Sequence, residues 1–436
     1  MPIPWAAPGR ARHGRAASDK MGELPIPTRS SMTPSPTPND IELQARALQV
    51  AQRVHAIEPF RVMEMVKAAG ELKRSGVDVI SMSVGEPDFT APEMVAAAAV
   101  EAIRAGVTQY TDSLGLRELR EAIAAHYSRV HALEIDPRRV VVTAGASAGL
   151  LLACAALVAE GAEILMPDPC YPCNRHFVSA FGGTPVLVPS SPDDRYQLSA
   201  RHVEEHWGER TRGVLVASPS NPTGTSMTGE QLQAMLAAVR ARGGFAIVDE
   251  IYQGLSYDHA PVSALALDPN AITVNSFSKY FNMTGWRLGW LVVPEALVPV
   301  FEKLAQNLFI CPSTIAQHAA LACFRPDALE VYEARRREFQ RRRDYLVPRL
   351  RELGFQVPVM PDGAFYVYAD IGKVAHAANE DSAAFSMAVL REAAVAIVPG
   401  DDFGFAAPAR HVRLSYATGL PRLEEAMARL ARMLGV

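Results

Sequence analysis

Short apolar runs alternate with amphipathic stretches over much of the chain. The runs predict seven buried strands, at residues 140–142, 163–166, 185–188, 213–217, 245–248, 272–275 and 288–293. Helical stretches separate several of these strands, as at residues 229–241. This alternation is typical of βαβ units, and it predicts a mostly parallel sheet with helices on both faces.

One apolar stretch, residues 140–159, contains no charged residue and is long enough to cross a bilayer. Its interior indicates otherwise, because a short strand is followed by a turn at residues 143–147 and then by a helix that ends at Glu160 and Gly161. A strand and helix inside a two-sided α/β sheet are apolar throughout for ordinary reasons. We therefore predict no membrane span.

The pattern changes after about residue 295. A long charged helix is expected at residues 328–353, strands at 364–369, 395–398 and 411–414, and a closing helix at 421–434. The expected fold class is α/β, with a large domain whose mostly parallel seven-stranded sheet is sandwiched by helices. A smaller α+β domain is built from both chain ends. The predicted limits are a disordered tail at residues 1–40, an N-terminal arm with part of the small domain at 41–87, the large domain at 88–310 and the small C-terminal domain at 311–436.

Composition narrows the possible partners and the cellular compartment. The 436 residues include 43 Lys+Arg against 47 Asp+Glu, so the net charge of −4 gives no general attraction to nucleic acid or to an anionic membrane. Acidic residues interrupt the arginine-rich run at 335–343, which indicates a solvated helix face. Five cysteines are too few for a disulfide scaffold and favour the cytoplasm. Cys170 and Cys173 have CxxC spacing but no second pair, so no metal site is predicted.

The segment SFSKYFNMTGWRLGW, residues 276–290, carries the strongest chemical signal. It follows a predicted strand, so Lys279 lies in a loop at the carboxyl end of the sheet, where open α/β sheets bind ligands. An amine that forms a Schiff base needs desolvation and nearby cations to lower its pKa from about 10.4. Ser276, Ser278 and Arg287 are suited to hold a phosphate. A solvated surface charge is the alternative reading of a lone lysine.

Other candidate residues stand in turns and at strand ends. The turn Gly145, Ala146 and Ser147 opens a helix, whose free N–H groups suit a phosphate. The remaining candidates are Gly85 in SVGEPD, Tyr110 in QYTDSLGL, Tyr171 in DPCYP, Asn221 in SPSNPTG, Asp249 and Tyr252 in DEIY, and Arg413 in VRLS. Each of these has an ordinary structural reading when taken alone, as a turn, a helix cap, a core residue or a surface charge.

In their order and spacing, these motifs resemble the class I and II pyridoxal-phosphate aminotransferases of the aspartate aminotransferase fold type, over about residues 55–436. The resemblance implies pyridoxal 5'-phosphate as cofactor, bound to Lys279 as a Schiff base. It implies that Ser276, Arg287 and the turn Gly145, Ala146 and Ser147 bind the cofactor phosphate, with Ser278 as a further candidate.

The same resemblance implies a role for each of the other candidate residues. It puts Asp249 against the pyridine nitrogen, where a carboxylate favours the protonated ring. Asn221 and Tyr252 contact the phenolic oxygen, and Tyr171 stacks on the ring. Arg413 binds the substrate α-carboxylate with help from Asn221, and the backbone of Gly85 approaches the substrate. Tyr110 reaches the phosphate of a neighbouring subunit, which implies a homodimer with shared active sites.

The resemblance implies a transaminase that moves an amino group from an L-amino acid to a 2-oxo acid by a ping-pong mechanism, with Lys279, Asp249 and Tyr252 as catalytic residues. A lyase on the same fold, of the C–S lyase or aminocyclopropane-carboxylate synthase type, is the alternative. A transcription regulator is disfavoured, because 40 proline-rich residues do not form a winged-helix domain. Two features point to uncharged substrates: Ser147 stands where some aspartate-specific relatives have a lysine, and the segment 57–63 is expected to form an apolar arm over the site.

Overall fold

The structure is a computed structural model that describes residues 50–59, 62–374 and 381–436. The predicted tail at residues 1–40 lies outside the described residues, and so do residues 60–61 of the predicted arm. Residues 52–436 form one unit and are described by themselves below.

The seven predicted strands form one sheet with the order β2-β8-β7-β6-β5-β3-β4. The strands are β2 (Val140–Thr143), β3 (Glu163–Asp168), β4 (Thr184–Pro189), β5 (Thr211–Ala217), β6 (Phe245–Asp249), β7 (Ile272–Ser276) and β8 (Gly289–Val292). β8 runs antiparallel to β2 and to β7, and every other neighbouring pair is parallel. The predicted fold class, an α/β fold with a mostly parallel seven-stranded sheet, is confirmed.

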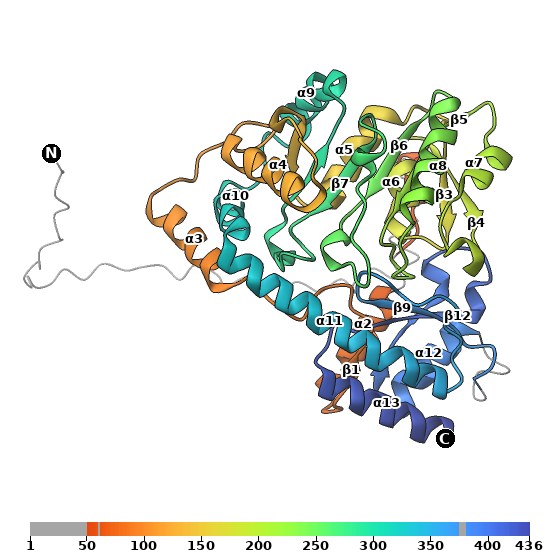
Figure 1. The fold of residues 1–436 in the computed structure, drawn as a ribbon. Helices are drawn as coiled ribbons and strands as arrows, with labels where there is room; N and C mark the ends of the chain where they lie inside the picture. The colour runs from red at the N-terminus through yellow and green to blue at the C-terminus, as the bar shows by residue number, and fades with distance from the viewer. Residues whose placement is uncertain (1–49, 60–61, 375–380) are drawn as a thin grey trace, which may run out of the picture. The chain divides into compact units, whose positions relative to one another are not determined.

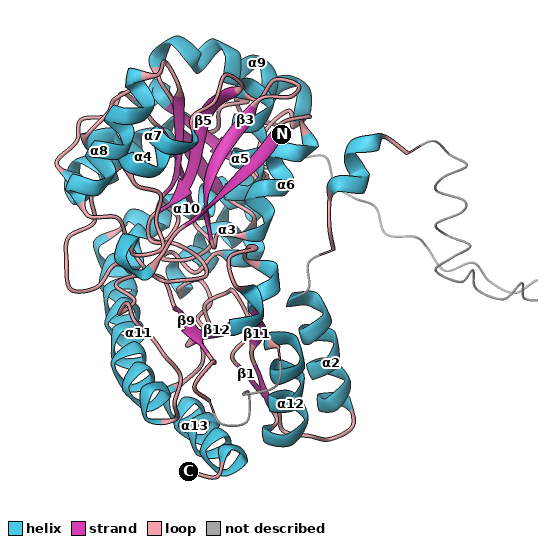
Figure 2. Ribbon diagram, turned by 90° about the vertical axis from the view of Figure 1, so that its right-hand side faces the viewer, coloured by secondary structure: helices cyan, strands magenta, loops and turns pink. Residues whose placement is uncertain are grey.

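Both faces of this sheet are buried, which explains its continuous apolar strands. In β5, Leu215 packs into one core with residues of α5 (Ala146–Leu157), α6 (Pro172–Ala180) and α9 (Val298–Leu308). Its neighbours Val214 and Val216 pack into a second core with α7 (Ala200–His206) and α8 (Gly229–Ala241). Figure 2 shows helices on both sides of the larger sheet.

Two smaller sheets lie below the large one in Figure 1. β9 (Tyr366–Asp370), β12 (His411–Ser415) and β11 (Val398–Pro399) form an antiparallel sheet, and β1 (Ile80–Ser81) pairs in parallel with β10 (Val395–Ala396). The β1–β10 pair joins the two ends of the described chain. The single strand predicted at 395–398 is therefore wrong, because the chain leaves one sheet and enters another within that run.

The helices beside these small sheets are α2 (Val62–Arg74), α12 (Ser382–Ala393), α13 (Leu420–Leu434) and the long α11 (Pro326–Glu352), which extends from beside α10 to beside α12 (Figure 1). α11 and α13 correspond to the predicted helices at 328–353 and 421–434. The predicted domain limits at residues 87/88 and 310/311 stay predictions.

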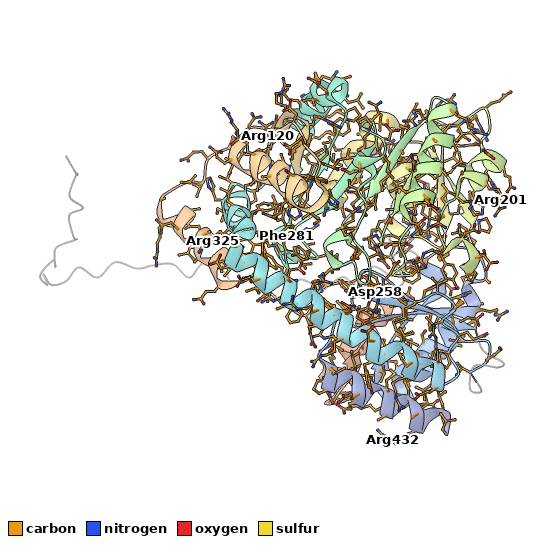
Figure 3. The ribbon with its side chains drawn as sticks, in the orientation of Figure 1. Arg120, Arg201, Asp258, Phe281, Arg325 and Arg432 are labelled. Carbon is orange, nitrogen blue, oxygen red and sulfur yellow. The ribbon has the colours of Figure 1, made fainter. Side chains whose placement is uncertain are left out.

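The remaining helices are α3 (Glu93–Arg104), α4 (Arg117–His131) and α10 (Thr314–Leu321). Short 3₁₀ helices are η1 (Gln52–Ala56), η2 (Pro137–Arg139), η3 (Pro192–Asp194), η4 (Gln253–Leu255), η5 (Ala264–Ala266), η6 (Thr284–Trp286), η7 (Glu295–Leu297), η8 (Ala322–Phe324), η10 (Gly400–Asp402) and η11 (Pro408–Arg410). In the described part of the chain, no helix is both long enough and apolar enough to cross a membrane. Figure 3 shows Arg201 and Arg432 at the periphery and Phe281 in the interior, where it is buried.

Candidate active site

Lys279 stands in the loop that follows β7. Its Nζ donates a hydrogen bond to the carbonyl oxygen of Gly85 at 2.5 Å. Burial lowers the pKa of Lys279 to about 8, the charge of Glu86 opposes this shift, and Arg413 and Arg287 add to it. A lysine with this pKa is partly neutral near neutral pH, so its amine is available as a nucleophile and as a base.

The end of β6 supplies a buried carboxyl group and a tyrosine. The backbone N–H of Ile251 donates to Oδ1 of Asp249 at 3.1 Å, and burial raises the pKa of this carboxyl to about 7. The hydroxyl of Tyr252 lies 3.0 Å from the hydroxyl of Tyr366 on β9. The Nζ of Lys279 lies 5.9 Å from the centre of the Tyr252 ring. The amine, the carboxyl group and the phenol therefore surround one space.

The first turn of α5 approaches Arg287, which lines the same cavity. Gly145 precedes the helix with a φ of 85°, and a Cβ there would lie only 2.6 Å from Nη2 of Arg287. Glycine thus lets the guanidinium approach the positive end of the helix dipole. Ser276 and Ser278 add hydroxyl groups whose oxygens lie 2.9 Å apart. An arginine, two hydroxyls and a helix N-terminus together suit a phosphate.

Arg413 lies on β12 and is almost fully buried. Its Nη1 donates to Oδ1 of Asn221 at 3.0 Å, and its Nη2 donates to the carbonyl oxygen of Ser83 at 2.7 Å. The guanidinium carbon lies 4.7 Å from the ring centre of Tyr366 and 4.9 Å from that of Phe403. Its buried Nε has no hydrogen-bond partner among the described residues. A buried arginine with a spare donor fits an acidic ligand.

A single cavity of about 470 Å³ brings these groups together. Twelve of the fourteen predicted site residues line it: Gly85, Ala146, Ser147, Tyr171, Asn221, Asp249, Tyr252, Ser276, Ser278, Lys279, Arg287 and Arg413. Gly145 lies directly behind the lining, against Arg287. Tyr110 is elsewhere on the surface with 79% of its area exposed, so its contact with a neighbouring subunit stays a prediction.

Sequence reasoning missed part of the lining. The missed residues are Val66, Val84, Glu86, Leu150, Ala217, Ile251, Thr284 and Tyr366. Val62 and Met63, which belong to the predicted arm at 57–63, also line the cavity. Tyr366 falls in an apolar strand and reads as a core residue, and only its phenolic hydroxyl signals a polar site.

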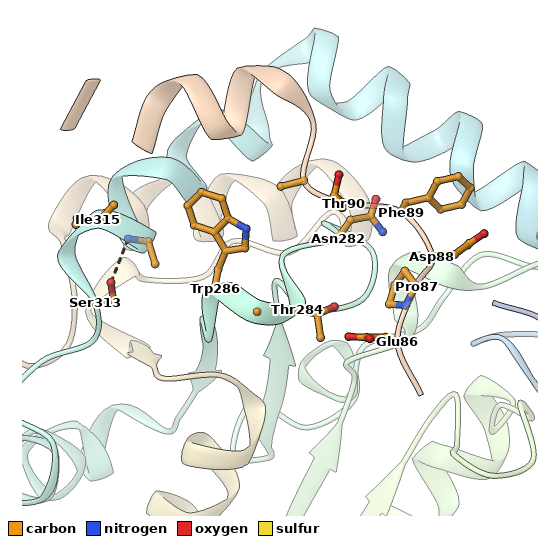
Figure 4. A pocket seen from close by; sticks show the side chains of 13 residues that line it. Glu86, Pro87, Asp88, Phe89, Thr90, Asn282, Thr284, Trp286, Ser313 and Ile315 are labelled. Atoms are coloured by element: carbon orange, nitrogen blue, oxygen red, sulfur yellow. Dashed lines mark hydrogen bonds between the residues drawn. The ribbon is translucent and has the colours of Figure 1, made fainter. Parts of the chain in front are cut away.

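A second cavity, of about 570 Å³, adjoins the first and shares Glu86 and Thr284 with it. Figure 4 shows Trp286 and Ile315 on one side of its lining and the 86–90 segment on the other. Among the described residues that line this second cavity there is no lysine or arginine, whereas Lys279, Arg287 and Arg413 line the first.

The fold and the site define the class of protein. A seven-stranded α/β sheet places a lysine, an aspartate and a set of groups suited to bind a phosphate at the ends of its strands. This is the arrangement that the resemblance implied. Comparison with known proteins agrees, since the family model described as aminotransferase class I and II matches residues 77–430. The chain belongs to the class I and II aminotransferases.

Individual relatives support this assignment. The chain is 41% identical to valine–pyruvate aminotransferase of Mycobacterium tuberculosis over 87% of this chain and 97% of the relative. It is 35% identical to an aspartate aminotransferase of Geobacillus stearothermophilus over 89% and 99% of the two chains. The solved aspartate aminotransferase of Thermus thermophilus with maleate superimposes with a TM-score of 0.82 at 34% identity, over 88% and 99% of the chains. The predicted transaminase activity is confirmed over the lyase alternative, and members of this family use pyridoxal phosphate.

Proposed function

We propose that this protein uses pyridoxal 5'-phosphate, held covalently by Lys279, to move an amino group from an uncharged L-amino acid to a 2-oxo acid. The observation that carries this proposal is the meeting of Lys279, Asp249 and Arg413 in one cavity. A lysine with a lowered pKa, a buried carboxyl group and a buried arginine match the three needs of the reaction. These are a covalent anchor that also moves protons, a partner for the ring nitrogen, and a site for the substrate carboxylate.

The residues of the cavity fit the cofactor. Arg287, Ser276, Ser278 and the first turn of α5 would hold its phosphate. The guanidinium comes so close to that turn that a Cβ at Gly145 would lie 2.6 Å from Nη2 of Arg287. When bound, pyridoxal phosphate supplies an electron-withdrawing ring that stabilises negative charge at the substrate Cα.

Four side chains would hold the ring itself. Asp249 is proposed to lie against the ring nitrogen, Tyr252 and Asn221 against the phenolic oxygen, and Tyr171 beside the ring face. All four line the cavity that Lys279 enters. The pyridinium would in turn favour the charged form of Asp249, whose pKa burial raises in this structure.

Lys279 is proposed to transfer the proton. Its pKa of about 8 leaves a useful fraction of neutral amine near neutral pH, which can accept a proton from the substrate Cα. Arg413 would orient that Cα by binding the α-carboxylate, because its planar guanidinium matches a carboxylate. The hydrogen bonds from Arg413 to Asn221 and to Ser83 hold the guanidinium in place.

The cavity wall supports an uncharged, aliphatic donor. Val62, Met63, Val66 and Ile251 contribute apolar side chains, and Ser147 adds no positive charge that would bind a second carboxylate. The relative named valine–pyruvate aminotransferase is consistent with this preference.

A homodimer with shared sites is also proposed. Tyr110 is 79% exposed, and its neighbour Gln109 accepts a hydrogen bond from Thr314 at the start of α10. Leu308 and Ile310, a few residues before α10, expose 53% and 52% of their area. Mixing the Lys279→Ala and Tyr110→Ala chains tests the proposal, since each hybrid dimer would regain one complete site. Activity no greater than the sum of the two variants would contradict it.

A cytoplasmic location is proposed with support from the five free cysteines.

A panel of donors assayed with 2-oxoglutarate and with pyruvate tests the proposed function. We expect the holoenzyme to convert L-valine and L-alanine to their 2-oxo acids and to accumulate pyridoxamine phosphate when no acceptor is present. Release of pyruvate or of an olefinic product from a single amino acid would instead indicate lyase chemistry.

A further inference from the structure

The turn that ends with Asp402 forms an unusual long-range contact. One carboxylate oxygen of Asp402, in η10, accepts a buried hydrogen bond from the backbone N–H of Val62 at 2.6 Å. The two residues are 340 positions apart in the sequence. N–H groups in the first turn of a helix lack partners within the helix, and a negative charge is favourable there. Asp402 thus holds the N-terminal end of α2 from a distant segment.

The same end of α2 forms one wall of the active-site cavity. Val62, Met63 and Val66 all line that cavity. Val62 is anchored in a small buried cluster with Tyr368, Val398 and Phe403. Met63 is 57% exposed and Val66 is 36% exposed, so both apolar side chains are accessible where they line the cavity. The position of this helical turn therefore determines the width of the apolar side of the cavity.

The Asp402 segment also touches the rest of the site. The backbone carbonyl of Asp402 accepts a hydrogen bond from Nη1 of Arg175 at 3.0 Å, and Nη2 of Arg175 lies 3.7 Å from a carboxylate oxygen of Glu58. The next residue, Phe403, lies under the guanidinium of Arg413 at 4.9 Å. One short segment thus contacts both the apolar wall and the arginine assigned to the substrate carboxylate.

We propose that Asp402 is a positioning residue that sets the donor side-chain preference by holding the first turn of α2 against the cavity. The proposal rests on the proposed function of this cavity, and it adds a specificity determinant that does not itself touch the substrate. Asp402 fixes the distance between the α-carboxylate subsite at Arg413 and the wall formed by Met63 and Val66. Branched aliphatic donors reach that wall, whereas L-alanine does not extend to it.

Kinetics of matched variants test the proposal. In Asp402→Ala we expect KM for L-valine and L-leucine to rise about tenfold relative to KM for L-alanine, with kcat changed less than about threefold. Asp402→Asn keeps an acceptor oxygen and should retain most of the native selectivity. The control is Thr228→Ala, because the hydroxyl of Thr228 accepts from the N–H of Gln231 at 3.1 Å at the start of α8, and Thr228 does not line the cavity. This control should lose stability without a change in the ratio of KM values.

A parallel rise of KM for all three donors, or an equal change of selectivity in Thr228→Ala, would overturn the proposal. So would an Asp402→Ala variant with native selectivity.

Amide hydrogen exchange supplies a readout that needs neither cofactor nor activity. In the protein without cofactor, amides in the first turn of α2 should exchange at least about tenfold faster in Asp402→Ala than in the wild type, with no such change in Thr228→Ala. Unchanged exchange would refute the role of Asp402. A wild-type protein that transaminates none of the donors would refute the proposed function instead, and the exchange experiment would still be informative. If Asp402→Ala fails to fold, the same comparison is made with Asp402→Asn, for which a smaller increase in exchange is expected.

Discussion

The buried carboxyl group of Asp249 should destabilise the protein without cofactor at alkaline pH, and Asp249→Asn should relieve that effect. Burial raises the pKa of Asp249 in the folded protein from 3.8 to about 7. Between these values the folded state keeps the proton and the unfolded state has lost it, so the free energy of unfolding falls as pH rises. The destabilisation that Asp249 causes is complete above the pKa of the folded state and absent below the pKa of the unfolded state. Asparagine does not titrate and keeps an oxygen that can accept from the N–H of Ile251.

The magnitude follows from the shift. From pH 5 up to the folded pKa of about 7, the folded state keeps the proton on Asp249 and the unfolded state does not. This range covers about two pH units, and each unit corresponds to about 1.4 kcal/mol. The stability of Asp249→Asn relative to the wild type should therefore increase by about 3 kcal/mol over this range. Urea unfolding of both cofactor-free proteins at the two pH values measures the change. The exposed Asp193 offers a control, since Asp193→Asn should change the free energy of unfolding by less than about 0.5 kcal/mol at either pH.

The opposite trend would refute the reasoning. If Asp249→Asn gains no stability relative to the wild type between pH 5 and pH 8, or loses stability, then the folded cofactor-free protein does not keep the proton on Asp249 over this range. With pyridoxal phosphate bound, the difference between the two proteins should shrink or reverse, because a pyridinium nitrogen beside Asp249 favours its charged form.

Three further substitutions probe the site. Tyr366→Phe removes the hydroxyl beside Tyr252, at 3.0 Å, and should lower kcat/KM about fivefold in steady-state assays; an unchanged value would exclude a role for this contact. Ser147→Lys introduces a cation into the cavity and should improve kcat/KM for L-aspartate relative to L-valine by at least about tenfold, and a fall in that ratio would contradict the assigned position of the donor side chain. Arg335→Met removes donors to the carbonyl oxygen of Thr90, at 2.6 Å, and to Oδ1 of Asn282, at 2.7 Å. Because the side chain of Asn282 donates to the carbonyl oxygen of Lys279 at 3.0 Å, kcat should fall about tenfold and KM should change less; a change in KM alone would show that the Lys279 loop does not depend on Arg335.

The strands of the large sheet could be predicted because each is a short apolar run buried on both faces. The same pattern fails at residues 395–398, where every residue is buried. An apolar run does not show which strand each of its residues pairs with. There the chain passes from β10 to β11, which belong to different sheets. The pattern also could not predict that β8 runs antiparallel to its neighbours, because an apolar run does not show in which direction its strand crosses the sheet.

The site could be predicted where its residues stand in local motifs at strand ends and helix starts, as Lys279 and Asp249 do. Tyr366 was missed because an aromatic residue in a buried strand looks like core. The role of α2 as a cavity wall depends on contacts such as that of Val62 with Asp402, 340 residues away, for which the local sequence holds no signal.

The central claim is that Lys279 carries the cofactor and moves the proton, and Lys279→Ala tests it most directly. Wild-type protein incubated with pyridoxal phosphate and desalted should show the visible absorbance of lysine-bound cofactor, and adding L-valine alone should convert it to the pyridoxamine form. Lys279→Ala should show neither the bound absorbance nor measurable transamination. A Lys279→Ala protein that transaminates L-valine at the wild-type rate would contradict the account.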